Sequence, residues 1–274
     1  MAWRAGLAAL AGSTSGWLSR RRQPQHESRG ATNVMVCSTG SWTSNLLFVP
    51  PSGFWADDDW YDLQMARRLP LCQDCLREFV YALPPLSGKR VVDVGAGTGR
   101  SAAAVAAAYP RAHLTLIDPD EGRLRTALVK LKRSWESSTA PLQEAPEPTL
   151  IAAALGSQQT PLPGCGGGYD CVLALQAVRH IVAPPAHYAR KHGLAVTGPA
   201  QIREGYAKLF KGLLLSLVPG GHVFLGDHVV HGHPGVYEHC RLLEEAGFVD
   251  IDIAWRQNDW FVIGARRPVS PVQG

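Results

Sequence analysis

The stretch that decides the fold is Val91-Val92-Asp93-Val94-Gly95-Ala96-Gly97-Thr98-Gly99. Its Val-rich beginning is typical of a buried strand. Glycines at alternate positions then let the backbone turn sharply and approach a ligand without collisions of a Cβ atom. An Ala-rich helix is expected from about Arg100 to Ala108. A strand, a glycine turn and a helix in this order predict a ligand site beyond the carboxyl end of the strand.

A second acidic residue, Asp118, ends the next expected strand, 19 residues after Gly99. A carboxylate at that distance suits hydrogen bonds from both hydroxyls of a ribose. The glycine spacing is G-x-G-x-G, whereas the dinucleotide pattern G-x-G-x-x-G would need glycine where Arg100 stands. Asp93 precedes the first glycine by two residues, and its charge is unfavourable near a pyrophosphate but favourable near an ammonium or a sulfonium. The pattern therefore favours a positively charged nucleoside over a dinucleotide.

Segments with strand and helix patterns alternate along the chain. One or two helices are expected between Trp55 and Leu83, ended by Pro84 and Pro85. The expected strands are Arg90–Val94, His113–Ile117, Thr149–Leu155, Cys171–Leu175, His222–Val230, Val249–Trp255 and Trp260–Ala265; the expected helices are Arg100–Ala108, Gly122–Trp135, Ala200–Leu217 and Val236–Ala246. This order predicts an α/β fold, a Rossmann-like doubly wound sheet of seven mostly parallel strands. The short connection Arg256–Asp259 predicts a terminal antiparallel hairpin.

Charge and composition suggest three regions. Residues 1–45 have no periodicity, 46–268 are expected to form one domain, and 269–274 form a tail. The first 50 residues hold five Arg and one Glu, a net +4, and the remaining 22 basic and 22 acidic residues cancel. The leader fits a mitochondrial transit peptide or a leader without an address, so a mitochondrial or a cytoplasmic location is expected. The neutral body does not favour nucleic acid as a partner, and no apolar run is long enough to span a membrane.

The segments VVDVGAGTGR (91–100) and LTLIDPD (114–120) resemble the class I S-adenosylmethionine-dependent methyltransferase family. The resemblance extends over about Pro85 to Arg267 and includes YDCVLALQAVRHI, LVPGGHVFLGD and LLEEAGFVDIDIAWRQ. It implies the cofactor S-adenosyl-L-methionine, with Gly95 and Gly97 along the methionine part and Asp118 at the ribose. The other expected cofactor-binding residues are Asp93, Ala96, Gly99, Pro119, Ser157, Gln158 and Gln176.

One departure from the family concerns the adenine. Many members place an acid after the third strand, where it contacts the adenine amino group. Here that region reads Ala154-Leu155-Gly156-Ser157-Gln158-Gln159. Ser157 or Gln158 can accept this hydrogen bond as a neutral group. The departure also leaves open a fold that has lost its activity.

The acceptor side is expected after the fourth strand, between Gln176 and His180. His180 is a candidate general base, although packing or a hydrogen bond to the backbone is the favoured explanation. The insertion from Val182 to Pro199 is expected to be a long loop, either a lid or a decoration; its polar residues are His187, Tyr188, Arg190, Lys191 and His192. Trp55, Trp60 and Tyr61 either close over the cofactor or pack on the core.

No metal site is expected. His228, His231, His233 and His239, with Asp227 nearby, lack the spacing of a zinc signature. Cys72 and Cys75 form a single C-x-x-C pair in a helical stretch, which favours reduced structural thiols.

The sequence therefore predicts methyl transfer to a small-molecule acceptor by in-line displacement. The signature of adenine-methylating members is missing at Leu175-Gln176-Ala177-Val178, and Cys171 lies within a strand, which disfavours a covalent cysteine mechanism. The alternatives are a tRNA or protein methyltransferase, and an assembly factor that binds the cofactor without turnover.

Overall fold

The computed structural model describes residues 58–69, 71–136, 145–156, 160–194 and 197–269. The chain enters the sheet after two helices, α1 (Asp58–Arg68) and α2 (Leu71–Ala82), as the sequence predicts. In α2 the fully buried residues Cys72, Cys75 and Phe79 share one face, because residues three and four apart lie together on a helix. Cys72 and Cys75 are both free thiols.

A seven-stranded sheet has the order β3-β2-β1-β4-β5-β7-β6. Strands β1 to β5 pair in parallel, and β7 pairs antiparallel with both β5 and β6. The bounds are β1 Arg90–Val94, β2 His113–Asp118, β3 Thr149–Ala152, β4 Tyr169–Leu175, β5 Leu217–His228, β6 Val249–Gln257 and β7 Trp260–Arg266. The predicted Rossmann-like doubly wound fold, with its terminal antiparallel hairpin, is confirmed.

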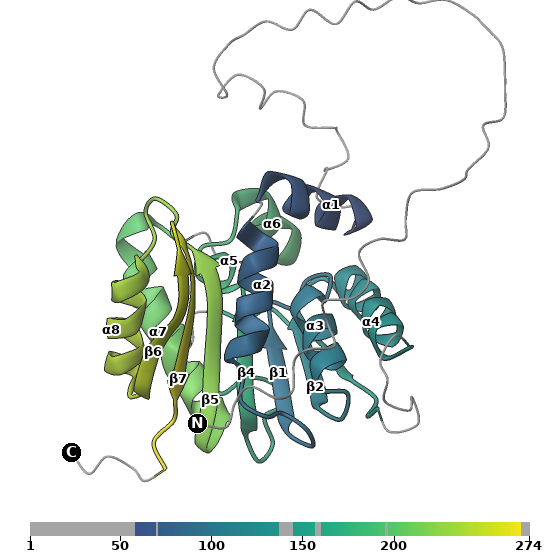
Figure 1. Cartoon of the computed structure of the whole chain (residues 1–274). Helices are drawn as coiled ribbons and strands as arrows, with labels where there is room; N and C mark the ends of the chain where they lie inside the picture. Colours follow the sequence, from purple (N-terminus) through teal and green to yellow (C-terminus); the bar gives the residue numbers. More distant parts are fainter. Residues whose placement is uncertain (1–57, 70, 137–144, 157–159, 195–196, 270–274) are drawn as a thin grey trace, which may run out of the picture. The chain divides into compact units, whose positions relative to one another are not determined.

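Helices cover both faces of the sheet (Figure 1). One face packs against α2, α3 and α4, and the other against α5, α7 and α8. The bounds of these further helices are α3 Arg100–Ala108, α4 Glu121–Glu136, α5 Val178–Val182, α7 Ile202–Ser216 and α8 Val236–Ala246. Val91 faces the first layer and Val92 the second, because successive strand residues point to opposite faces. In the described part of the chain, no helix has the length and apolar character needed to cross a membrane.

Three expectations need correction. The third strand ends at Ala152 and not at Leu155, because β2, the strand with which it pairs, ends at the paired residue Asp118. The fifth strand begins at Leu217 and not at His222, since Leu217 pairs with Tyr169 before the register shifts. The insertion between Val182 and Pro199 is not simply a loop: it contains α6 (Ala186–His192) and, at its end, the short helix η3 (Pro199–Gln201).

Candidate functional site

The glycine turn after β1 and the acid after β2 are joined by hydrogen bonds. Gly95 and Ala96 donate their backbone N–H groups to the carbonyl of Ile117, over 2.9 and 3.1 Å. Gly97 donates its N–H to Oδ2 of Asp118 over 3.0 Å. The other carboxylate oxygen of Asp118 accepts the N–H of Asp120 over 2.9 Å. The two motifs therefore form one rigid unit at the carboxyl ends of adjacent parallel strands.

Asp93 of β1 is buried next to helix α3. It points to the same side of the sheet as Val91, toward α3, and it is only 1% exposed. Its Oδ2 accepts a 2.5 Å hydrogen bond from Ser101, whereas its Oδ1 is buried without a partner among the described residues. Burial raises the pKa of Asp93 to about 7. Asp93 is thus placed to hold the start of α3 and does not line the cavity described next, and its direct contact with the cofactor stays a prediction.

A cavity of about 430 Å³ opens in front of the turn, within the size range of small-molecule sites. Of the predicted cofactor residues, Gly95, Asp118, Pro119 and Gln176 line it. Most of the remaining wall is apolar and comes from β2, the segment after β3, helices α1 and α5, and the residues that follow α1 and α6; it includes Ile117, Ala153, Ala154, Leu155, Ile181, Met65, Leu69 and Leu194. The cavity therefore joins the cofactor motifs to the region expected to hold the acceptor.

Three other predicted cofactor residues, Ala96, Gly97 and Gly99, do not line the cavity. Gly99 precedes α3 with φ +78°, and an added Cβ would stand 2.6 Å from Cβ of Ala127 on α4. This glycine therefore allows α3 and α4 to pack closely. Ser157 and Gln158 lie outside the described residues, as do Trp55 and the side chain of Trp60. Tyr61 of α1 lines the cavity.

Polar side chains gather at the carboxyl ends of β4 and β5. Arg179, His180 and His228 all line the cavity there. Arg179 forms an ion pair with Asp227, which is 5% exposed and lies behind it. Nη1 of Arg179 also lies 3.3 Å from Nδ1 of His228, whose ring stacks on Trp260 at 4.7 Å. Burial and the neighbouring guanidinium lower the pKa of His228 to about 4, so this imidazole is neutral at pH 7.

The candidate base, His180, faces the same space. Surrounding protein and the charge of Arg179 lower its pKa well below the usual range for histidine. A neutral imidazole can accept a proton, but a strongly lowered pKa makes it a weak base. The geometry thus brings His180 to the acceptor side, while its electrostatics favour a role in hydrogen bonding.

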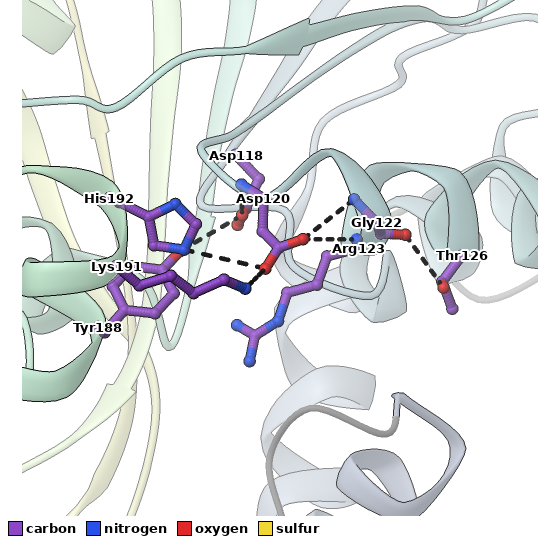
Figure 2. A network of polar contacts seen from close by, with 8 residues as sticks. All are labelled: Asp118, Asp120, Gly122, Arg123, Thr126, Tyr188, Lys191 and His192. Atoms are coloured by element: carbon purple, nitrogen blue, oxygen red, sulfur yellow. Dashed lines mark hydrogen bonds and ion pairs between the residues drawn. The ribbon is translucent and has the colours of Figure 1, made fainter. Parts of the chain in front are cut away.

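Helix α6 contributes Tyr188 to the cavity wall. Figure 2 shows Tyr188, Lys191 and His192 of this helix beside Asp118 and Asp120. The hydroxyl of Tyr188 lies 3.5 Å from Oδ1 of Asp118, and Lys191 forms a 2.6 Å ion pair with Asp120. Arg123, at the start of α4, places its guanidinium over the ring of Tyr188 at 5.8 Å and over that of Tyr61 at 5.3 Å. The insertion that the sequence left open as a lid or a decoration therefore supplies part of the wall.

Two further histidines from the same part of the sequence, His233 and His239, each contact a protein group of their own. His233 contacts the hydroxyl of Tyr206 through Nδ1 at 3.1 Å, and His239 contacts the carbonyl of Gly235 at 2.9 Å. Among the described residues, no group of three or more His, Cys, Asp or Glu side chains is arranged to hold a metal ion.

Arg179 and Arg123 are the site residues that the sequence analysis missed. Arg179 is the only charged residue between Val172 and Ala189, and such a residue in an apolar stretch after a strand was the available signal. Arg123 gave no such signal, because it belongs to a basic helix in which several side chains are exposed.

The sheet order, the glycine turn and the cavity at the ends of β1, β2 and β4 define the class of doubly wound α/β proteins, in which ligands bind at the carboxyl ends of the strands. Residues 62–262 match the family model described as a methyltransferase domain. Because this match covers most of the chain, the protein belongs to the class I S-adenosylmethionine-dependent methyltransferase family.

Solved structures similar to this chain include the following three. The pyocyanin biosynthetic protein PhzM is 18% identical, with a TM-score of 0.51 over 76% of this chain and 58% of that chain. The methyltransferase SibL is 21% identical (TM-score 0.48; 77% and 58%), and human N-acetylserotonin methyltransferase is 14% identical (TM-score 0.48; 78% and 58%). This chain thus spans little more than half the length of these proteins. No protein of curated function matches the sequence.

Proposed function

We propose that this protein uses S-adenosyl-L-methionine to methylate a small-molecule acceptor. The observation that carries the proposal is one continuous cavity, bounded by Gly95 and Asp118 on one side and by Arg179, His180 and His228 on the other. The cofactor supplies an electrophilic methyl group on a sulfonium. The protein's contribution is to hold an acceptor atom in line with that group, which can account for much of the acceleration.

The residues present fit this cofactor. Asp118 is fixed by two backbone N–H groups, and a carboxylate retains further acceptor sites for ribose hydroxyls. Gln176 lines the cavity, and its amide Nε2 is buried without a hydrogen-bond partner among the described residues. Such a donor is costly unless a ligand satisfies it, and a carboxylate of the methionine part is a suitable acceptor. Apolar residues such as Ile117, Pro119 and Leu155 suit the adenine face.

Gln176 also adopts an unusual backbone conformation. Its φ is +55°, although it is not glycine, and its N–H is held by the carbonyl of Gly226 over 2.6 Å. Strained residues of this kind persist where the surrounding structure fixes them, and they are concentrated at ligand sites. The orientation of Gln176 toward the cavity therefore supports a binding role.

Two measurements test the proposal. Calorimetry with S-adenosyl-L-methionine is expected to show binding at one site per chain, and absence of binding would contradict the proposal. Incubation of a labelled methyl donor with a fractionated extract is then expected to place label in small molecules. Label in tRNA or protein would favour the other enzyme classes, and binding without transfer would favour a role as an assembly factor.

A further inference from the structure

We propose that the acceptor carries a carboxylate, which is bound by Arg179 and His228 at the ends of β4 and β5. This inference rests on the proposed function, since it names the class of molecule that would share the cavity with the cofactor.

The charged residues of the wall favour an anion. Among the described residues that line the cavity, Arg123 and Arg179 are basic and Asp118 is the only acid. Asp118 already accepts two backbone N–H groups and is assigned to the ribose. The cofactor itself carries a net charge of about +1, because its ammonium and sulfonium outweigh its carboxylate. An acceptor with a negative charge would therefore be favoured in this space over a neutral or cationic one.

Arg179 is held in a fixed orientation with donors left over. Its ion pair with Asp227 and its contact with His228 both use Nη1. Nη2 and Nε have no other polar contact among the described residues, and arginine remains charged at any working pH. A guanidinium edge with two N–H groups matches the geometry of a carboxylate. The buried Asp227 thus orients the guanidinium without lining the cavity itself.

His228 adds a donor of the same kind. A guanidinium nitrogen can only donate, so Nδ1 of His228 accepts the hydrogen bond from Arg179. A neutral imidazole that accepts at Nδ1 carries its proton on Nε2. Nδ1 also lies 3.5 Å from Oδ1 of Asp227, but its contact with Arg179, at 3.3 Å, is the shorter of the two. The neutral ring therefore favours the tautomer with its proton on Nε2. In this tautomer His228, which lines the cavity together with Arg179, has an N–H donor at Nε2.

The rest of the acceptor would be apolar. Helix α1 contributes Tyr61 and Met65 to the cavity, and Leu69 follows directly after this helix; Met65 is 6% exposed. Side chains of this kind bury an aromatic or aliphatic body but offer few partners for polar groups. The surface as a whole suits a small molecule with one carboxylate and an apolar body.

Benzoate and benzamide form a matched pair of probes, since they share a ring and differ in charge. Calorimetry would use the full chain saturated with S-adenosylhomocysteine, which carries no methyl group to transfer. Benzoate is expected to bind at least about tenfold more tightly than benzamide, and Arg179→Met is expected to abolish this preference. Arg125→Met, which removes an exposed guanidinium on α4, is the control and is expected to retain the preference.

Removal of Arg179 alone leaves the charge of Asp227 buried and unpaired, so this variant risks misfolding. The double variant Arg179→Met, Asp227→Asn removes both charges and is expected to fold and to lose the preference equally. Equal binding of both probes, no benzoate binding at about 10 mM, or a preference that survives in the double variant would overturn the inference. These outcomes differ from failure of the proposed function, in which the chain would not bind S-adenosylhomocysteine at all.

Discussion

Oδ2 of Asp118 accepts a 3.0 Å hydrogen bond from the backbone N–H of Gly97, 21 residues earlier in the chain. The second carboxylate oxygen of Asp118, Oδ1, accepts the N–H of Asp120. The two hydrogen bonds together fix the carboxylate before any ligand binds. Burial raises the pKa of Asp118, while these two hydrogen bonds oppose that rise and favour the charged form. The acid of the second strand and the glycine turn of the first therefore act as one preorganised acceptor.

Replacement of Asp118 tests this acceptor. We expect Asp118→Ala to weaken binding of S-adenosyl-L-methionine at least about tenfold, since hydrogen bonds to a charged group contribute about 1.5–3 kcal/mol. Calorimetry measures the dissociation constant. Glu121→Ala, at a nearby exposed position of α4, is the matched control and is expected to change it less than about twofold. An unchanged affinity in Asp118→Ala would show that the ribose is held elsewhere.

Replacement of Gly95 and of Gly88 by Ala separates the effect of backbone strain on stability from the effect of a steric collision. Both have positive φ, +65° and +71°. An added Cβ at Gly95 would stand 2.7 Å from Cβ of Ala177, whereas at Gly88 it would meet nothing within 4 Å. Each change to Ala is expected to cost about 1–2 kcal/mol for the left-handed backbone, and Gly95→Ala about 1–3 kcal/mol more for overpacking.

Urea unfolding gives these stabilities, and calorimetry gives the affinity for the cofactor. Only Gly95→Ala is expected to weaken cofactor binding, because Gly95 lines the cavity. Equal losses of stability in the two variants would show that the contact with Ala177 relaxes without cost.

Most elements of the fold could be predicted because local patterns in the sequence indicate them. The strand Arg90–Val94 and the helices Arg100–Ala108 and Val236–Ala246 have the predicted bounds, since glycine or polar residues mark their ends. The end of β3 could not be predicted, because it depends on where its neighbour β2 stops pairing. Helix α6 was missed for a related reason: it is short, and its residues are fixed by contacts with Asp118 and Asp120 of another segment.

The site was predictable in part for the same reason. Asp118 was found because its role depends on spacing along the chain, and it does line the cavity. The surroundings of Asp93 could not be read from spacing, since alternation along β1 turns its side chain toward α3 and Ser101. Arg179 gained significance only from its proximity to Asp227 and His228, which are about 48 residues away in sequence and adjacent only in the folded sheet.

The buried carboxyl of Asp93 should make the stability depend on pH. Its pKa is raised to about 7 from the ordinary value of 3.8, so between these pH values the folded chain holds a proton that the unfolded chain has lost. The contribution of Asp93 to stability is therefore present below about pH 4 and is lost as pH rises through about 7.

Asp93→Asn removes this titration and keeps an oxygen that can accept the hydrogen bond of Ser101. We expect the free energy of unfolding of the wild type to fall relative to that of the variant between pH 4 and pH 7, and the difference to stay constant above pH 8. Urea unfolding at several pH values measures it. A difference that does not change between pH 4 and pH 8 would mean that Asp93 is already ionised in the folded protein at acid pH.

Substitutions of Tyr188 test whether this residue contributes to the cofactor site as part of the cavity wall or as a hydrogen-bond donor. Its hydroxyl is 3.5 Å from Oδ1 of Asp118, at the limit of a hydrogen bond, while its ring lies against His192 at 4.4 Å and under Arg123. We therefore expect Tyr188→Phe to change the affinity for S-adenosyl-L-methionine less than about threefold, and Tyr188→Ala to weaken it at least about tenfold, because only the second change removes the cavity wall. Calorimetry on both variants decides between the roles. If Tyr188→Phe weakened binding as much as Tyr188→Ala, the hydroxyl would be the important group, and α6 would hold the cofactor through a polar contact that tightens on binding.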